Sequence, residues 1–206
     1  MYQEVTHPCI QHKLALIRDI EAGHKKFREL ATEITMFVCY EALKNIKVRE
    51  VDVQTPMAVA KCHMIDEDIV VVPILRAGVG MLDGILSLIP SARVGFFGLE
   101  RDEETARPTT YYEKMPREIN DGITIIVDPM LATGGSTIAA IDMLKRQGAR
   151  RIVAVCILTC HAGLAAVQDA HPDVRIYAAS IDPELNEKKY IVPGLGDAGD
   201  RLYGTT

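Results

Sequence analysis

The chain of 206 residues lacks several features that mark specialised classes of protein. It has no tryptophan, no Cys-x-x-Cys pair and an odd number of cysteines, five in all, which argues against a disulfide framework. No apolar stretch approaches the about 20 residues that cross a membrane, and the first residues do not resemble a secretory signal. We therefore expect a cytoplasmic protein with reduced thiols and no membrane partner.

An excess of basic residues is also absent. The chain has 23 Lys and Arg against 28 Asp and Glu, which gives a net charge of −5. A general nucleic-acid binder usually carries a basic stripe, so we expect no nucleic-acid partner, although a local basic pocket is compatible with this balance. The apolar share of 48% is typical of a globular chain, and a chain of this length can bury one sizeable core.

The order of hydrophobic patterns predicts an α/β fold. Helical periodicity covers residues 13–22 and 25–44, which Gly23 separates. From Ile69 onward, short apolar runs typical of buried strands alternate with helical stretches. The strands are expected at 69–75, 93–99, 123–128, 151–158 and 174–180, and the helices at 79–89, 135–147 and 162–170. This alternation predicts a mostly parallel sheet flanked by helices on both faces.

The pattern predicts one domain, 1–206, in three parts. Residues 1–50 form a helical arm, residues 69–180 an α/β core, and residues 182–206 an irregular, glycine-rich hood. Open α/β sheets bind ligands at the carboxyl edge, and we expect the hood to cover that edge. The polar stretch 100–121 is expected to be a long functional loop. Met36 and Phe37, on one stripe of the second helix, are expected in the core or in a dimer contact.

The stretch ITIIVDPMLATGGST, residues 123–137, carries the clearest chemical signal. A buried strand ends at Asp128, and a loop with Thr133, two glycines and Ser136 leads into a helix. Unpaired N–H groups at a helix N-terminus, with glycines that allow close approach, are typical of a phosphate site. The loop matches neither the P-loop nor the Gly-x-Gly-x-x-Gly signature. Asp128 is suited to ribose hydroxyls or to a hydrated Mg²⁺.

This stretch resembles the loop with which type I phosphoribosyltransferases bind 5-phospho-α-D-ribose 1-diphosphate (PRPP). Most of that family has two adjacent acids here, whereas Pro129 fills the second position, as in the uracil phosphoribosyltransferases. Three further segments resemble the uracil enzymes, in the expected order. They are HPCIQHKL (7–14), PILRAG (73–78) and YIVPGLGDAGDR (190–201).

The resemblance implies the type I phosphoribosyltransferase fold and a salvage reaction, in which uracil and PRPP give UMP and diphosphate. It implies Mg²⁺ as cofactor, bound mainly through PRPP and near Asp197, with no metal ligand assigned to a side chain. It also implies a homodimer or a higher homo-oligomer, and GTP as an activator in some members. Two alternatives stay open. One is a transferase for another nucleobase, and the other is a non-catalytic regulator with this fold that binds nucleotide or RNA.

The resemblance also implies roles for individual residues. Arg76 and Arg101 contact PRPP, and the loop after Arg101 closes over it. The resemblance adds a non-proline cis peptide bond, expected at Arg76–Ala77. The expected catalytic residues are Arg76, Arg101, Asp128 and Asp197. The full PRPP set is Arg76, Arg101, Asp128, Pro129, Met130, Leu131, Ala132, Thr133, Gly134, Gly135, Ser136 and Asp197. The uracil set is Ile191, Gly196, Asp197 and Ala198, of which Ile191, Gly196 and Ala198 act through backbone groups.

Other reactive side chains have simpler interpretations. Cys156, Cys160 and His161 have no second half of a metal site, so we expect two buried thiols and a histidine at a helix start. Asp200 and Arg201 are neighbours of opposite charge, and we expect an ion pair with no catalytic role.

Overall fold

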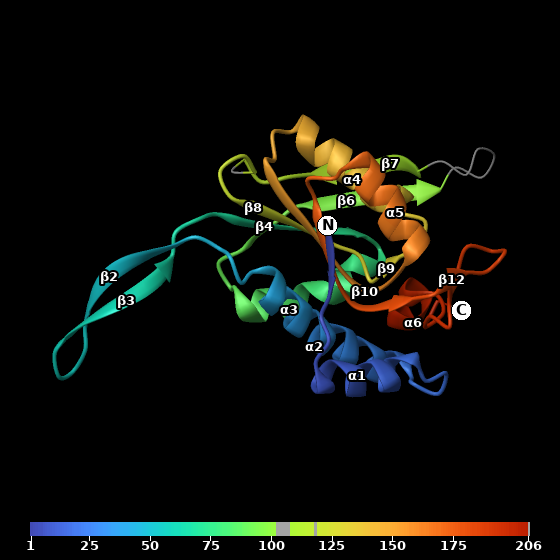
Figure 1. Cartoon of the computed structure of the whole chain (residues 1–206), viewed down its shortest axis with the longest axis horizontal. Coiled ribbons are helices and arrows are strands. Elements are labelled where there is room, and N and C mark those ends of the chain that lie inside the picture. Colours follow the sequence, from blue (N-terminus) through green and yellow to red (C-terminus); the bar gives the residue numbers. More distant parts are fainter. Residues whose placement is uncertain (102–107, 118, 206) are drawn as a thin grey trace.

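The computed structural model describes residues 1–101, 108–117 and 119–205 of the chain. Its centre is a sheet with helices on both faces (Figure 1), in the strand order β1-β11-β10-β8-β4-β6-β7. All pairings along this path are parallel except β6 with β7. The predicted α/β fold with a mostly parallel sheet is confirmed. None of the helices in the described ranges has the length and apolar composition needed to cross a membrane.

The strands of the central sheet include every strand expected from the apolar runs. They are β1 (Tyr2–Glu4), β4 (Ile69–Leu75), β5 (Arg93–Val94), β6 (Phe96–Arg101), β7 (Pro108–Lys114), β8 (Ile123–Val127), β9 (Met130–Leu131), β10 (Arg151–Cys160) and β11 (Arg175–Asp182). Two antiparallel pairs lie outside it, β2 (Val48–Gln54) with β3 (Val59–Ile65), and β12 (Glu184–Leu185) with β13 (Ile191–Val192).

Helices cover the two faces of the sheet in separate groups (Figure 1). On one face lie α1 (Pro8–Arg18), α2 (His24–Ala42), the 3₁₀ helix η1 (Ala77–Met81) and α3 (Leu82–Leu88), and on the other lie α4 (Gly135–Arg146) and α5 (His161–Ala170). The short helix α6 (Ala198–Tyr203) near the chain end contacts α2 and η1.

Both faces of the central strands are buried, which explains their continuous apolar runs. In β8, Ile123, Ile125 and Val127 pack with the α1–α2–α3 layer, and Ile126 packs with the α4–α5 layer. Successive side chains of a strand point to opposite faces, so each strand contributes to both cores.

The N-terminal 50 residues contain more than the two expected helices. The first helix begins at Pro8 and ends at Arg18, earlier than the expected 13–22, because proline suits the first helical position and the His7 ring accepts a hydrogen bond from the Cys9 N–H. The second helix matches its prediction. Strand β1 and the start of β2 were missed, since their residues are largely exposed and show no burial pattern.

Two expectations for residues 93–121 were wrong in detail. The strand expected at 93–99 is divided at Gly95 into β5 and β6. The stretch 100–121 is not loop throughout, because β7 pairs antiparallel with β6. Strand β7 starts at a proline, which suits a strand's first residue, and its tyrosines are exposed, so hydrophobic periodicity did not reveal it.

Candidate active site

Two loops leave the same edge of the sheet. Strands β4 and β8 are parallel neighbours with Pro73 opposite Val127, so the segments that follow them, with Arg76 and Asp128, emerge together. Gly78 lies so close to the Val127 carbonyl that no side chain fits there. This packing of the two loops explains the glycine at position 78, two residues after Arg76.

Asp128 occupies the junction between β8 and the candidate phosphate loop. Its side chain is half-buried, and its only hydrogen bond in the described part of the chain is a long one, 3.4 Å from the Met130 N–H to Oδ1. Burial raises the pKa of Asp128 to about 7, and the hydrogen bond from Met130 offsets part of that rise. The free protein therefore holds a carboxyl group that lacks strong donors and is available to a ligand.

The loop after Asp128 combines a buried first part with an exposed second part. Pro129 is buried, and its carbonyl accepts hydrogen bonds from the N–H groups of Ile157 and Leu158, at 3.0 and 2.9 Å. Leu131 is also buried, so these residues shape the backbone and do not face solvent.

The second part of the loop opens helix α4. Gly134 precedes its first turn with φ at 84°, a left-handed conformation that favours glycine, and no side chain caps the helix. Thr133 and Ser136 are exposed on either side. Uncapped N–H groups with two nearby hydroxyls form an arrangement suited to a phosphate.

Asp182, at the end of β11, holds the C-terminal segment at the sheet edge where β4 and β8 end. Asp182 accepts two hydrogen bonds from the Arg18 guanidinium, at 2.6 and 2.7 Å, and one from the Gly194 N–H at 2.9 Å. Arg18 also donates to the Gly194 carbonyl at 2.7 Å. Burial alone would raise the pKa of Asp182, but the hydrogen bonds and charge of these partners lower it overall. Helix α1 and the hood are thus joined by one largely buried network.

A second arginine holds the same segment from the other side. Arg201 donates to the carbonyls of Ile17 and Leu195, both at 2.9 Å, and stacks over the Phe27 ring at 4.5 Å. Burial lowers the pKa of Arg201. The expected ion pair with Asp200 is wrong, because Arg201 satisfies backbone carbonyls while Asp200 turns toward Arg76.

Arg76 meets the C-terminal helix at the mouth of the site. Its Nη2 lies 3.7 Å from Asp200 Oδ1, and its carbonyl accepts a 3.1 Å hydrogen bond from the Tyr203 hydroxyl. Its side chain is 61% exposed, which leaves it accessible to a ligand. The non-proline cis peptide is Leu75–Arg76, one bond earlier than expected.

A pocket of about 330 Å³ lies where these segments meet. Seven expected site residues line it: Asp128, Met130, Ala132, Ile191, Gly196, Asp197 and Ala198. Arg76 and the segment 133–136 do not line the pocket. Arg76 directly precedes the lining residue Ala77, and the segment 133–136 directly follows the lining residue Ala132. Arg101 ends β6, and its side chain is outside the described part of the chain. Segments distant in the sequence therefore converge on one pocket.

Further residues of the pocket were not in the expected set. Lys188, Lys189 and Tyr190 line it from the turn between β12 and β13. The signal available in the sequence was their position immediately before Ile191. The side of the turn that faces the pocket depends on the hairpin geometry, which the sequence pattern alone does not specify.

Asp197 has both a structural contact and a place in the pocket. Its Oδ1 accepts a 2.9 Å hydrogen bond from the Asp200 N–H and caps α6, while the residue itself is exposed. In the described ranges no three His, Cys, Asp or Glu side chains are grouped as metal ligands. Cys156 and Cys160 are buried free thiols, and His161 begins α5, all as expected.

The fold and the site define a class. A mostly parallel sheet flanked by helices on both faces is a fold that this chain shares with type I phosphoribosyltransferases of known structure. The adenine phosphoribosyl transferase of Trypanosoma brucei superposes with a TM-score of 0.54 at 15% identity, covering 84% of this chain and 71% of its own. A hypoxanthine-guanine phosphoribosyltransferase of Bacillus anthracis gives 0.52 at 12% identity, covering 77% and 80%.

Within that class, the chain belongs to the uracil phosphoribosyltransferase family, whose family model matches residues 4–205. The uracil phosphoribosyltransferase of Clostridium botulinum (strain Eklund 17B) is 53% identical over 203 residues, 98% of this chain and 97% of that protein. The enzyme of Symbiobacterium thermophilum is 54% identical over 202 residues, with the same coverage. A solved structure from Aquifex aeolicus, 38% identical, covers 100% of this chain and 99% of its own with a TM-score of 0.95.

Proposed function

We propose that the protein transfers the phosphoribosyl group of PRPP to uracil, giving UMP and diphosphate in pyrimidine salvage. The observation that carries this proposal is the shared pocket. There, Asp128 at the start of the phosphate loop meets the C-terminal segment 191–198 across about 330 Å³. The two substrates require this arrangement, because a charged sugar phosphate and a planar base must react side by side.

Different residues of the site bind different parts of PRPP. The turn 133–136, in which Thr133 and Ser136 are exposed, and the N-terminus of α4 bind the 5′-phosphate through N–H groups and hydroxyls. Asp128 accepts hydrogen bonds from the ribose hydroxyls, which supply the donors that its carboxylate lacks in the free protein. Arg76, with its exposed guanidinium, and Arg101 bind the diphosphate.

The reaction forms a bond between uracil N1 and ribose C1 as the bond from C1 to the diphosphate oxygen breaks, and the proton of uracil N1 is released to water. Positive charge develops on the ribose and negative charge on the diphosphate. Arg76 and Arg101 stabilise the departing diphosphate, and the carboxylate of Asp128 faces the ribose. No side chain is required as a nucleophile, so catalysis depends on orientation and on neutralisation of charge.

The acidic groups of the pocket fit a divalent cation that arrives with its substrate. Protein sites for Mg²⁺ commonly use one or two carboxylates together with substrate phosphates. Asp197 lines the pocket with an exposed carboxylate, and the described residues offer no larger ligand cluster. When bound, Mg²⁺ would neutralise charge on the diphosphate, and Asp197 is the side chain that would hold it.

Uracil selectivity rests on backbone groups. We assign the base to the N–H and carbonyl groups of Ile191, Gly196 and Ala198, with Asp197 beside it. The loop carrying them is fixed by the Arg18–Asp182 and Arg201 contacts, so its polar groups are held in place before the base binds.

The test is incubation of the purified protein with PRPP and Mg²⁺ and, separately, uracil, cytosine, hypoxanthine, guanine, adenine and orotate, with products separated by chromatography. UMP from uracil alone is expected, and its loss with a chelator would support the Mg²⁺ assignment. Turnover of another base would overturn the assignment of residues 191–198. A folded protein that binds PRPP and converts no base would favour a regulatory role.

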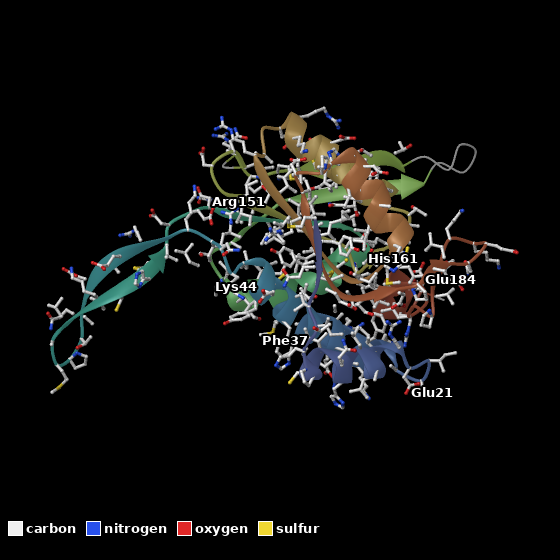
Figure 2. The ribbon with its side chains drawn as sticks, viewed as in Figure 1. Glu21, Phe37, Lys44, Arg151, His161 and Glu184 are labelled. Carbon is white, nitrogen blue, oxygen red and sulfur yellow. The ribbon has the colours of Figure 1, made fainter. Side chains whose placement is uncertain are left out.

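The protein is further proposed to act as a cytoplasmic homodimer. One face of the β2–β3 hairpin carries Val51, Val53, Ala60, Cys62 and Met64, and the hairpin projects from the body of the molecule (Figure 1). A groove of about 780 Å³ beside α2, lined by Met36 and Phe37 among others (Phe37 is labelled in Figure 2), adds further apolar surface. A second copy of the chain is the partner we assign to these surfaces.

GTP activation is a separate part of the proposal, and it rests on the family resemblance. The rate of UMP formation at low PRPP concentration, measured with and without GTP, tests it. An unchanged rate across a GTP titration would remove it.

A further inference from the structure

Two lysines form the cationic side of the pocket. Lys188 and Lys189 line it from the β12–β13 turn, and the other charged residues of that lining, Asp128 and Asp197, are acidic. We infer that Lys189, assisted by Lys188, binds phosphate oxygens of PRPP and so acts as a substrate-binding residue. This inference rests on the proposed function, since it takes PRPP as the ligand of the pocket.

The turn that carries the lysines is well defined by hydrogen bonds. Asn186 Oδ1 accepts from the N–H groups of Lys188 and Tyr190, both at 3.0 Å. Backbone hydrogen bonds of 2.9 Å link Lys189 N–H to the Asn186 carbonyl and Asn186 N–H to the Tyr190 carbonyl. Both lysines therefore project from a fixed backbone, which lowers the entropy lost when their ammonium groups bind a ligand.

The backbone of Lys189 is unusual for its residue type. Its φ is 66°, and in the described part of the chain it is the only residue other than glycine with positive φ. Glycine adopts this conformation at lower energetic cost. A long cationic side chain at such a position indicates that the side chain itself has a use.

The charges of these lysines are free for a ligand. Neither ammonium group takes part in an ion pair in the described part of the chain, and both residues are exposed. PRPP carries several negative charges, and the two acids of the lining would repel it in the absence of cations. The lysines supply that compensation at the pocket mouth.

The position of the turn is compatible with a contact from the lysines to either of two phosphate groups of PRPP. Strand β12 contacts helix α5, and Figure 2 shows Glu184 near His161, where that helix begins. Ala132, next to the 5′-phosphate loop, and Ala77, next to Arg76, both line the pocket that the lysines border. The shared chemistry is a phosphate oxygen, from either the 5′-phosphate or the diphosphate.

The test compares steady-state kinetics of wild-type protein with Lys189→Met, Lys189→Arg and Lys189→Gly. We expect Met and Gly to raise the KM for PRPP about fivefold, with a small change in the KM for uracil, and Arg to preserve it. The KM for PRPP should also depend less on salt concentration in the Met variant. Lys25→Met, at a residue whose side chain is 84% exposed on α2, is the matched control and should leave both constants unchanged.

Lys189→Gly separates binding from structure. Glycine relieves the positive φ, so this variant should melt at or above the wild-type temperature while its KM for PRPP rises. A structural role would instead be shown by lower melting temperatures for Gly and Met, with matching increases in both KM values, and would overturn the inference.

Product inhibition identifies the phosphate concerned. UMP carries the 5′-phosphate alone, whereas inorganic diphosphate represents the leaving group. Weaker inhibition by one of them in Lys189→Met assigns the contact, and an unchanged KM for PRPP with both inhibition constants unchanged overturns the inference. Absence of UMP formation by the wild-type protein would be a different failure, that of the proposed function.

Discussion

Asp128 illustrates how a residue suited to binding a ligand can lower the stability of the free protein. Its carboxyl group is partly removed from water and has only the long contact with Met130 N–H. A group in this state is costly when ionised and becomes favourable once a ligand supplies hydrogen-bond donors. Function and stability should therefore respond in opposite directions to changes at this position.

Activity is the first of these responses. Asp128→Asn should lower kcat/KM by at least about 100-fold, because an amide cannot supply the negative charge facing the developing ribose cation. Met130→Leu, a similar apolar volume in the same loop, should stay near the wild-type rate. UMP formation measured on both variants gives the comparison, and equal activities would show that Asp128 is not in the site.

Stability is the second response, and it depends on pH. The folded-state pKa of Asp128 is raised from 3.8 to about 7, so between these values the native state binds more protons than the unfolded state. Stability from this group is therefore lost as the pH rises through that window. Without substrates, Asp128→Asn should be more stable than wild type by about 1 to 3 kcal/mol at pH 8. This range is smaller than the pKa difference alone implies, because water in the open pocket screens the charge.

At pH 5 the same substitution should have a much smaller effect, since the wild-type carboxyl is then largely protonated. Thermal or urea unfolding at the two pH values provides the measurement, with the exposed Asp121→Asn as control. A difference between wild type and Asp128→Asn that is equal at both pH values would contradict the raised pKa.

Among the elements, burial decided which could be predicted from the sequence. Strands β4, β8 and β10 are covered on both faces, so their apolar runs reveal them almost to the residue. Strands β1, β2, β3 and β7 have exposed side chains and are held by backbone pairing, which leaves no period in the sequence. The pocket follows the same rule: Asp128 and Asp197 lie in recognisable segments, whereas Lys189 faces the pocket because of a hairpin turn.

The contact between α1 and the hood makes a prediction at the scale of elements. Asp182→Ala removes a buried acceptor, which leaves the half-buried Arg18 guanidinium and the buried Gly194 N–H without it. We expect a loss of about 2 to 4 kcal/mol in the free energy of unfolding at pH 7. Asp66→Ala, which removes an exposed pair with Arg49, should cost less than about 1 kcal/mol.

The pH dependence of the destabilisation by Asp182→Ala follows from the pKa of Asp182. The folded-state pKa of Asp182 is below its ordinary value of 3.8, so its contribution is present above that pH and is lost as the pH falls through the folded value. Urea unfolding at pH 7 and near pH 3 should show the difference between variant and wild type shrinking at the lower pH. Destabilisation equal to that of Asp66→Ala would show that the network does not hold the hood.

At the scale of the whole molecule, the β2–β3 hairpin is the feature that a lone chain explains least. Its two faces differ in charge. One carries Val51, Val53, Ala60, Cys62 and Met64 with a single charged residue, Arg49. The other carries Val48, Val59 and Ile65 among charged residues, with Lys61 paired to Glu50 and Asp52. An isolated two-stranded hairpin is only marginally stable in water. A partner on the apolar face accounts for its presence.

Replacing Val53 by Glu and Met64 by Lys should therefore dissociate the proposed dimer without unfolding the body of the chain. Light scattering should show a fall from twice the mass of the chain to the mass of one chain, while circular dichroism stays unchanged. The control carries Glu50→Gln and Lys61→Gln on the other face, and it should remain dimeric. A wild-type protein that is monomeric at high concentration would contradict the proposal.

The hood contacts also determine when the site is completed during synthesis. Arg18 leaves the ribosome early, but its partner Asp182 lies 164 residues later, and Arg201 reaches back 184 residues to Ile17. Helix α1 can pack against α2 early, but its contacts with the C-terminal segment wait for almost the entire chain. A nascent chain halted before residue 182 contains residues 128–136 but lacks residues 191–198, so under the proposed function nucleobase recognition is the last property that the folding polypeptide acquires.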